Sequence, residues 1–279
     1  MSSLSAHDGS AVFSCPHCKL PLDHTATGSQ CATGHSFDRA REGYLNLLVG
    51  GRLTTADPRG DSPDALVARR RFLAAGHYRP IADLMAAVVG DVLGDRGGPL
   101  LDVGCGEGYY MSTLDMATLP GTTRYGIDIS KAAVRMAAKA IPDGRFAVGS
   151  AYRLPVLDGS VGAVLSVFGP RPFDEFQRVL RPGGDWVAVT PAADHLRELR
   201  PAMSDEAVQK AQERAQRRAV APEEAAQAHR LTFALDLADD AANDLLHMTP
   251  IRWQHDGHEA ARTTVRAITV DVWVSTSRR

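Results

Sequence analysis

A glycine-rich turn directly after a short apolar strand sets the strictest limit on how this chain folds. Residues 100–110 read LLDVGCGEGYY, and Gly104, Gly106 and Gly108 follow Asp102 in the pattern D-x-G-x-G-x-G. Glycines at this spacing let the backbone turn sharply and approach a ligand closely. The third glycine comes one residue earlier than in the dinucleotide pattern G-x-G-x-x-G, and the chain contains no G-K-[ST] phosphate loop. The turn therefore favours a nucleoside cofactor that carries no phosphates.

Asp128 is the second candidate residue of this site. It ends the next predicted strand, in the sequence YGIDIS, 24 residues after Gly104. A carboxylate at this place in a doubly wound fold accepts hydrogen bonds from both ribose hydroxyls of a nucleoside. We therefore expect Asp128 to bind ribose.

Apolar strands alternate with helices from residue 98 onward. Runs such as 161–167 are apolar throughout, which is typical of strands buried on both faces of a parallel sheet. The last two strands instead alternate apolar and polar residues, which favours an antiparallel pair. The sequence thus predicts an α/β fold with a mostly parallel sheet and an antiparallel edge strand. The predicted strands are 99–103, 123–127, 145–148, 161–167, 186–189, 230–237 and 268–275, and the predicted helices are 64–72, 81–93, 132–139 and 239–247.

Three of the four cysteines and a histidine cluster near the N-terminus. Cys15, Cys18, Cys31 and His35 have the spacing C-x2-C-x12-C-x3-H. Thiolate and imidazole are ligands that Zn²⁺ prefers, and four of them fill a tetrahedron with no position left for water. The pattern predicts a structural zinc site that supplies folding free energy to a segment unable to form its own core. A redox-active CPHC pair and unconnected thiols are the alternatives.

The composition is that of a globular chain. With 279 residues, 44% of them hydrophobic, the chain suffices for one large domain and a small appendage. It holds no run of about eighteen uncharged apolar residues, so we expect no membrane span, and its first residues lack a secretory signal. Four cysteines are too few for a disulfide framework, so we expect a reducing, cytoplasmic location. We predict a zinc-binding module at 1–38, an arginine-rich linker with helices at 39–97 and the cofactor-binding domain at 98–279.

Basic residues are concentrated locally, because the net charge of the whole chain is only −2. Residues 39–79 hold eight arginines against four acids. The run 69–71 either contacts phosphates or forms a solvated or internally paired face, since three consecutive helical residues spread across about 200°. Residues 204–228, polar and rich in arginine, are predicted to form a solvated helical insertion, with RNA contact as the alternative. Phe37, Tyr44 and Tyr110 either stack on an unpaired base or pack in the core.

The glycine turn and the strand after it resemble the motifs of class I S-adenosylmethionine-dependent methyltransferases. Two further turns, GSAYRLP at 149–155 and VLRPGG at 179–184, occur in the order typical of these enzymes, and the resemblance covers roughly 99–191. It implies a class I methyltransferase (Rossmann-like) sheet and S-adenosylmethionine as cofactor. Many of these enzymes have an acid where Ser150 stands, so adenine recognition here would use the backbone and the Ser150 hydroxyl. The resemblance places Asp102, Gly104, Gly106, Glu107, Asp128 and Ser150 around the cofactor.

Two sequence features narrow the range of atoms that could accept the methyl group. Exocyclic amines are usually methylated opposite a [DN]-P-P-[YFW] motif, but residues 167–170 read VFGP. Methylation of pyrimidine C5 needs a cysteine nucleophile, and Cys105 lies in the cofactor turn. Ring nitrogens, hydroxyls and carbon acids remain as acceptors.

Six segments in a fixed order resemble the bacterial 23S rRNA guanine-N1 methyltransferases, and this resemblance spans nearly the full length. It rests on the zinc ligands and on EGYLNLL at 42–48, ARRRFLAAGHYRPI at 68–81, CGEGYY at 105–110, TPAADHLREL at 190–199 and LLHMTPIRW at 245–253. The resemblance implies methylation of a guanine in a 23S rRNA hairpin lining the peptide exit tunnel, in the branch associated with resistance to tylosin-type macrolides. A small-molecule methyltransferase and a non-catalytic ribosome-binding factor are the alternative functions.

The same resemblance implies further roles for individual residues. Tyr78 and His195 would reach the cofactor pocket, the zinc module would help to hold rRNA, and the protein would form a homodimer. Loss of the guanine N1 proton invites a general base, and His195, Asp194 and Glu198 lie just past the fifth strand. His195 is a candidate for cofactor or guanine contact, for the base, or for a capping residue. Glu107 is a candidate for cofactor contact, for a helix-start acid, or for the proton acceptor.

Overall fold

The computed structural model describes residues 11–48, 60–202, 225–249 and 264–279. Most of the insertion predicted at 204–228 lies outside these residues, and so do Arg52 and Arg59 and the end of the segment 245–253. In the described part, no helix combines the length and the apolar character that a bilayer crossing requires.

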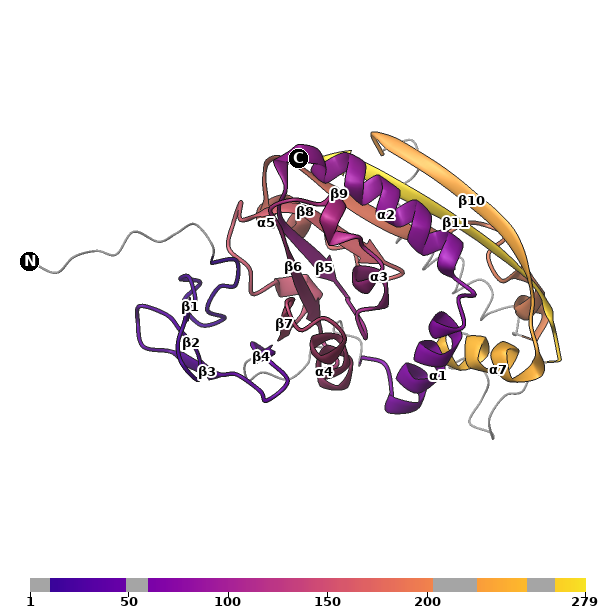
Figure 1. Cartoon of the computed structure of the whole chain (residues 1–279), viewed down its shortest axis with the longest axis horizontal. Coiled ribbons are helices and arrows are strands. Elements are labelled where there is room, and N and C mark those ends of the chain that lie inside the picture. Colours follow the sequence, from indigo (N-terminus) through magenta and orange to yellow (C-terminus); the bar gives the residue numbers. More distant parts are fainter. Residues whose placement is uncertain (1–10, 49–59, 203–224, 250–263) are drawn as a thin grey trace, which may run out of the picture.

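An eight-stranded sheet forms the body of the molecule, in the order β10-β11-β9-β8-β5-β6-β7-β4 (Figure 1). The strands from β9 across to β4 pair in parallel, whereas β11 is antiparallel to both of its neighbours. The prediction of a mostly parallel sheet with an antiparallel strand is therefore confirmed. The strands are β4 (Leu45–Asn46), β5 (Gly98–Val103), β6 (Thr122–Asp128), β7 (Arg145–Val148), β8 (Val161–Val167), β9 (Leu180–Pro191), β10 (Gln227–Asp236) and β11 (Ala267–Arg278).

The last two strands of the chain form the antiparallel pair at the edge of the sheet, as the sequence predicts. β11 is inserted between β9 and β10, and β10 is the edge strand. The alternation of Ile268, Val270 and Val272 suggested one solvated face, but Asp271 between them is fully buried. Its carboxylate accepts hydrogen bonds from Arg230 and Thr232 of β10, so these two exposed residues cover the buried carboxylate on β11. β10 alternates between exposed and half-buried residues, as an edge strand does.

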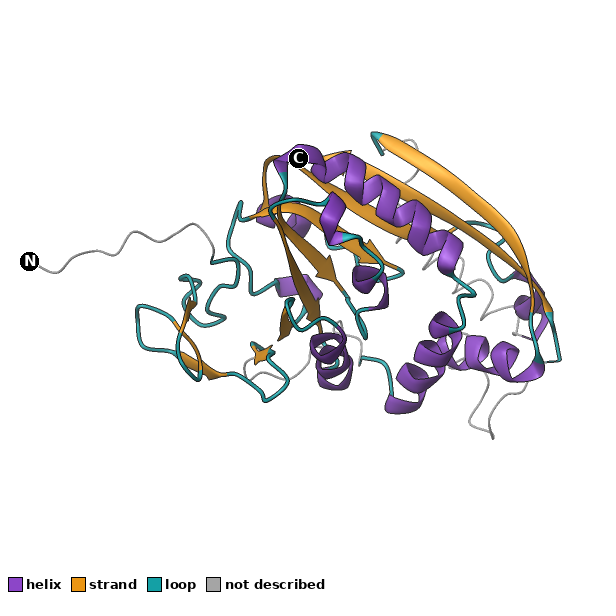
Figure 2. Cartoon of the chain, viewed as in Figure 1, coloured by secondary structure: helices purple, strands orange, loops and turns teal. Residues whose placement is uncertain are grey.

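Helices cover both faces of the sheet, as Figure 2 shows. Alternate residues of the strands point to opposite faces, so Leu100 of β5 packs with α2, α4 and α7, while Leu101 packs with α5 and the N-terminal module. This gives the three-layer arrangement of a doubly wound fold. The helices are α1 (Pro63–Ala74), α2 (Arg79–Leu93), α3 (Tyr109–Ser112), α4 (Lys131–Ala140), α5 (Phe173–Val179) and α7 (Asp239–Met248), with 3-10 turns η1 (Gly94–Arg96), η2 (Met116–Thr118), η3 (Ala151–Arg153) and η4 (Arg197–Ala202).

The N-terminal module is a three-stranded antiparallel sheet of β1 (Asp23–His24), β2 (Gly28–Gln30) and β3 (Ser36–Asp38). It lies beyond the β4 end of the main sheet, opposite the β10 edge (Figure 1). Phe13 joins it to the main body, because Phe13 forms a β-bridge with Val156 and its ring packs edge-on against Tyr125 at 5.4 Å. The module therefore shares one apolar core with the sheet.

The segment 39–97 contributes to the main body rather than only linking to it. β4 adds a strand beside β7, and α2 packs on β8, β9 and β11. The domain limits at residues 38 and 97 stay a prediction, since both flanking segments are continuous with the same core.

Candidate functional site

The glycine turn leaves β5 at the carboxyl edge of the sheet, where doubly wound folds bind ligands. Gly104, Gly106 and Gly108 have φ angles of +79°, +54° and +85°, which other L-residues rarely adopt. Gly104 also faces Pro170, because an added Cβ would lie 3.2 Å from its Cδ. These three positions therefore require glycine for reasons of backbone geometry.

The carboxylate of Asp128 holds this turn in place. Oδ2 accepts a hydrogen bond of 3.0 Å from the main-chain N–H of Gly106, and Oδ1 accepts one of 2.8 Å from Ser130. Ser130 then caps α4 by accepting from Ala133. Burial raises the pKa of Asp128, although these two N–H donors lower it. The structure thus brings together the glycine turn and the acid that the sequence predicted to face it.

Three buried polar atoms around the turn have no hydrogen-bond partner within the described residues: Oδ1 of Asp102, Oε1 of Glu107 and the hydroxyl of Tyr110. Burial, with added repulsion from Asp128 and Glu107, raises the pKa of Asp102 to about 8. Burial also raises the pKa of Glu107. Unpaired buried acids are costly, so this cluster is suited to a cationic ligand.

The arginine run 69–71 splits among three surroundings. Arg69 points to the turn, with Nη1 at 2.6 Å from Asp61 and 3.8 Å from Glu107. Arg71 pairs with Asp244 of α7, its Nε lying 2.8 Å from Oδ2. Arg70 is exposed. Two of the three arginines therefore pair within the molecule, which is the internally paired alternative of the sequence analysis.

An aromatic group stands beside the turn, at the end of β8. Phe168 stacks on His195 with ring centroids 5.7 Å apart, and Tyr78 lies 6.1 Å from Phe168 and 6.4 Å from His195. Phe168 has a φ of +52°, an unusual conformation for a bulky residue. The main-chain N–H of Phe168 donates to the carbonyl of Val189, and the hydroxyl of Ser166 donates to the carbonyl of Pro170. These two hydrogen bonds fix the strained turn. Strain of this kind concentrates at functional sites.

The imidazole of His195 is oriented by the backbone of β11. Its Nδ1 accepts a hydrogen bond of 3.2 Å from the main-chain N–H of Asp271. In the neutral ring the proton is then on Nε2, which makes that atom a donor. Tyr78, the other residue that the family resemblance placed at the pocket, is buried at the start of α2.

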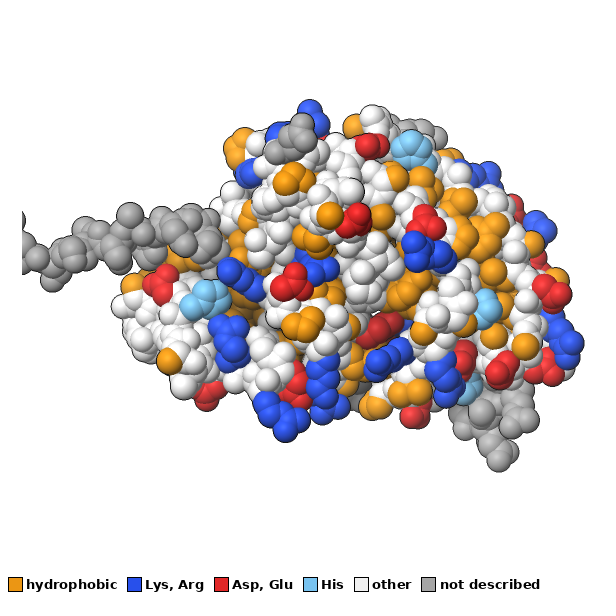
Figure 3. Space-filling model, viewed as in Figure 1, with side chains coloured by type: hydrophobic (Ala, Val, Ile, Leu, Met, Phe, Trp, Pro, Cys, Tyr) orange, Lys and Arg blue, Asp and Glu red, His pale blue; other side chains and the backbone are white. Residues whose placement is uncertain are grey.

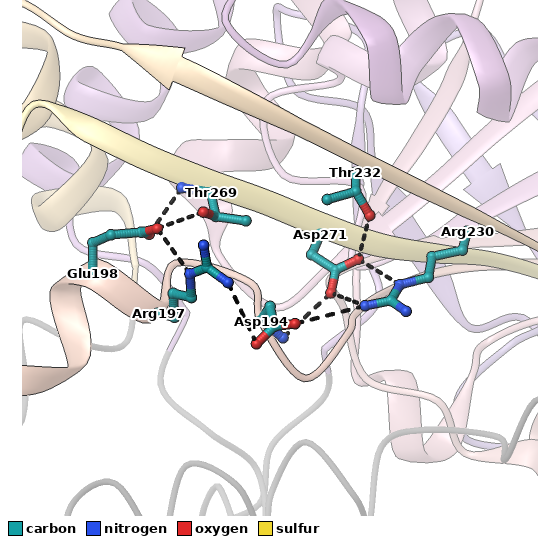
Figure 4. A network of polar contacts seen from close by, with 7 residues as sticks. All are labelled: Asp194, Arg197, Glu198, Arg230, Thr232, Thr269 and Asp271. Carbon is teal, nitrogen blue, oxygen red and sulfur yellow. Dashed lines mark hydrogen bonds and ion pairs between the residues drawn. The ribbon is translucent and has the colours of Figure 1, made fainter.

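Asp194 and Glu198 belong to a structural network, which Figure 4 shows. Glu198 accepts from the main-chain N–H of Thr269 at 2.8 Å, and from its hydroxyl and from Arg197. Asp194 lies between Arg197 and Arg230, at 3.9 and 3.8 Å. These pairs hold η4 and the loop after β9 against the β10–β11 pair. Both acids therefore have structural partners.

Ser150 follows β7 next to Asp128. The N–H of Gly149 donates to the main-chain carbonyl of Asp128 at 3.0 Å, which brings the two strand ends together. The Ser150 hydroxyl accepts from the N–H of Tyr152 at 3.3 Å and caps η3. Ser150 is buried at this edge.

The four N-terminal candidate ligands converge. One ligand atom from each of Cys15, Cys18, Cys31 and His35 lies within 4.8 Å of all the others, and no other metal-ligand group occurs among the described residues. Cys31 Sγ is 3.4 Å from His35 Nδ1, and Cys18 Sγ is 3.6 Å from Cys31 Sγ. The N–H of Gly34 donates to Cys31, at a φ of +88° that closes the second turn. Three thiols and one imidazole at these distances fit a tetrahedral Zn²⁺.

Sequence reasoning missed Asp61 and Phe168 and gave Tyr110 no cofactor role. The one sequence signal beside Phe168 is the glycine at 169. The structure explains that glycine, because the turn lies so close to the glycine loop that an added Cβ would meet the carbonyl of Val103. Phe37 and Tyr44 are buried in the core, which is the packing alternative of the sequence analysis.

Two family models match the chain. Residues 13–49 match "RlmA, N-terminal", a zinc ribbon, and residues 100–184 match "Methyltransferase domain". The sheet and its cofactor turn accordingly form a class I methyltransferase fold.

Three relatives match over most of the chain. A 23S rRNA (guanine(748)-N(1))-methyltransferase of Streptomyces fradiae is 36% identical and covers 89% of this chain and 88% of its own length. A candidate 23S rRNA (guanine-N1)-methyltransferase of Micromonospora griseorubida is 38% identical, covering 66% and 67%. One of Bacillus subtilis is 31% identical, covering 87% of both chains. The chain therefore belongs to the family of 23S rRNA (guanine-N1)-methyltransferases.

Proposed function

We propose that this protein transfers the methyl group of S-adenosylmethionine to N1 of a guanine in a 23S rRNA hairpin lining the peptide exit tunnel. The observation that carries the proposal is the full-length relationship to the S. fradiae enzyme, with the zinc cluster and the glycine turn both intact. A small-molecule methyltransferase has no need of a zinc module. A binding factor has no need of the acids that surround the turn.

The residues present fit S-adenosylmethionine. Asp128 has the position to accept the ribose hydroxyls, and Ser150 lies on the same side for adenine. The unpaired oxygen of Glu107 matches the positive charge of the cofactor, and the unpaired oxygen of Asp102 offers it a hydrogen-bond acceptor. When bound, the cofactor supplies a methyl group on a sulfonium, and catalysis then consists largely of alignment.

Phe168, His195 and Tyr78 are proposed to receive the guanine. Guanine N1 is occupied in a base pair, so the base must be unpaired before it reaches the site. Aromatic faces stack on such a base, and the fixed turn at Phe168 holds one face beside the cofactor loop. His195 is oriented to donate a hydrogen bond from Nε2. A donor at this atom favours contact with the guanine or the cofactor over a role as the general base.

The zinc ion has a structural role in this proposal. Four protein ligands leave no open position, and the ion would join the turn at residues 15–18, before β1, to the turn between β2 and β3. The module is anchored to the main sheet at Phe13, so an ordered module is held against Val156 and against Tyr125 of β6.

A basic stripe on α4 is proposed to contact RNA phosphates. Lys131, Arg135 and Lys139 are exposed and stand four residues apart, which places them on one side of the helix. α4 starts three residues after Asp128, so the stripe begins at the cofactor edge. Figure 3 shows basic side chains gathered at the lower margin, over the zinc module and α4. Such contacts position RNA without reading its sequence.

Three broader properties follow as proposals. Methylation of a tunnel guanine would confer resistance to tylosin-type macrolides, the branch that the sequence resembles. Ribosomal RNA as substrate implies a cytoplasmic location. A homodimer would frame the RNA between two zinc modules, and sedimentation equilibrium tests this state directly.

Transfer of labelled methyl groups tests the proposal. Purified protein is incubated with labelled S-adenosylmethionine and 23S rRNA, and the RNA is digested to nucleosides. Label that co-migrates with 1-methylguanosine supports the proposal. Label in another nucleoside, or no label in RNA, contradicts it.

A further inference from the structure

Arg69 is a half-buried cation at the centre of an acidic site. It comes from α1, 35 residues before Gly104 in sequence, yet an added Cβ at Gly106 would lie 3.4 Å from its Nη1. Its guanidinium therefore lies directly against the glycine turn. Its positive charge acts on both Glu107 and Asp128.

Three contacts fix the guanidinium in this position. Nη1 lies 2.6 Å from Asp61, which is partly exposed, and 3.8 Å from the buried Glu107. Nη2 donates to the main-chain carbonyl of Met248 at 3.4 Å, at the end of α7. The chain before α1 is also held at this edge, because an added Cβ at Gly60 would lie 2.7 Å from Cβ of Ser130. The 3.8 and 3.4 Å contacts are long, so the guanidinium retains donor capacity.

The charges of the cofactor require a cation here. S-adenosylmethionine carries a sulfonium, an ammonium and a carboxylate. The first two match the acids of the turn, but Glu107 and Asp128 repel the carboxylate unless a positive group faces it. A guanidinium is the side chain best suited to bind a carboxylate in a buried site.

We infer that Arg69 binds the methionine carboxylate of S-adenosylmethionine and that Asp61 and Met248 orient its guanidinium for this contact. The inference rests on the proposed function and adds a residue from α1 to a site otherwise formed by the sheet edge. It also assigns α1 a role: the helix carries the group that matches the one negative charge of the cofactor.

Two ligands that differ only in the carboxylate test this assignment. Isothermal titration calorimetry measures Kd for S-adenosylmethionine and for decarboxylated S-adenosylmethionine, which keeps the sulfonium and the amine. The proteins are the wild type, Arg69→Met, Arg69→Lys and the matched control Arg70→Met, whose side chain is exposed on the same helix.

The expected result is selective. Arg69→Met raises the Kd for S-adenosylmethionine at least tenfold, the change expected for loss of a charged hydrogen bond. The same variant binds the decarboxylated ligand with a Kd within about threefold of the wild-type value. Arg69→Lys falls between the wild type and Arg69→Met, and Arg70→Met binds both ligands as the wild type does. Binding of the decarboxylated ligand shows at the same time that the Arg69→Met site is folded.

Other results overturn the inference. Equal weakening of both ligands, or loss of both, assigns Arg69 a purely structural role, and no change for either ligand removes it from the site. These outcomes are separate from failure of the proposed function. That function fails if the wild type binds neither ligand, or if it binds the cofactor and leaves 23S rRNA unmethylated.

Discussion

The main-chain N–H of Gly106 donates a hydrogen bond of 3.0 Å to Oδ2 of Asp128. The two residues are 22 positions apart in sequence: Gly106 lies three residues after the end of β5, and Asp128 is the last residue of the neighbouring parallel strand β6. One carboxylate thereby sets the conformation of the turn and leaves the ends of both strands open to a nucleoside. Binding of the cofactor and order of the turn are coupled through this contact.

Replacing Asp128 by asparagine tests that coupling. The amide keeps the shape of the side chain but has only one acceptor oxygen for two main-chain donors and the ribose hydroxyls. We expect S-adenosylmethionine to bind at least tenfold more weakly, measured by calorimetry. The matched control is Asp143→Asn, which removes an exposed partner of Arg124. Equal affinities for the two variants would be inconsistent with the account.

The buried carboxyl of Asp102 predicts a specific dependence of stability on pH. Its pKa is about 8 in the folded protein and close to 3.8 in the unfolded chain, so between these values the folded state binds the additional proton. The free energy of unfolding therefore falls as pH rises, by about 1 kcal/mol per pH unit from this group.

Asp102→Asn removes this proton linkage. Denaturant unfolding of the cofactor-free protein at pH 6, 7 and 8 should show the variant gaining stability relative to the wild type as pH rises. Parallel pH profiles for the two proteins would show that Asp102 has an ordinary pKa.

The strand pattern was readable from sequence because the sheet is buried on both faces. The apolar run at Val161–Val167 matches β8 in both bounds. β4 escaped prediction because two residues have no periodicity. The burial of Asp271 in β11 was not predictable, because it depends on Arg230, 41 residues earlier in sequence, and no local pattern contains that pair.

The sequence predicted some residues of the candidate site but not others. Asp128 follows from spacing, since the position of the acid is fixed by two adjacent strands. Arg69 and Phe168 depend on how α1 and the turn after β8 pack against the glycine loop, which is a tertiary property. The sequence predicted that Arg69, Arg70 and Arg71 do not all point to one side, because consecutive residues spread around a helix. Only the structure shows the partners of Arg69 and Arg71.

Metal removal should unfold the N-terminal module. We expect one zinc per chain, released with a colorimetric chelator, and a lower Tm after removal, because the ion supplies on the order of 10 kcal/mol to the fold of such a module. Cys18→Ala should lose the metal, whereas Cys105→Ala should retain it, since Cys105 lies in the glycine turn. Full zinc content in Cys18→Ala would contradict the four-ligand site.

The basic stripe on α4 predicts a change in the salt dependence of RNA binding. Each single change to glutamine at Lys131, Arg135 or Lys139 should reduce the slope of log K against log salt by about 0.7 to 0.9. Arg266→Gln is the control, because this exposed arginine pairs with Asp239 away from α4. Filter binding with a 23S rRNA hairpin measures the slope. An unchanged slope in all three variants would exclude α4 from the RNA interface.

Primer extension on 23S rRNA tests the central claim most directly, because a methyl group on guanine N1 blocks base pairing and stops the polymerase. After incubation of purified wild-type protein with S-adenosylmethionine and 23S rRNA, we predict a strong stop at one guanine of an exit-tunnel hairpin, and a much weaker stop with Asp128→Asn. Labelled RNA without a stop would place the methyl group on another atom, and unlabelled RNA with no stop would contradict the assignment of this protein as an rRNA methyltransferase.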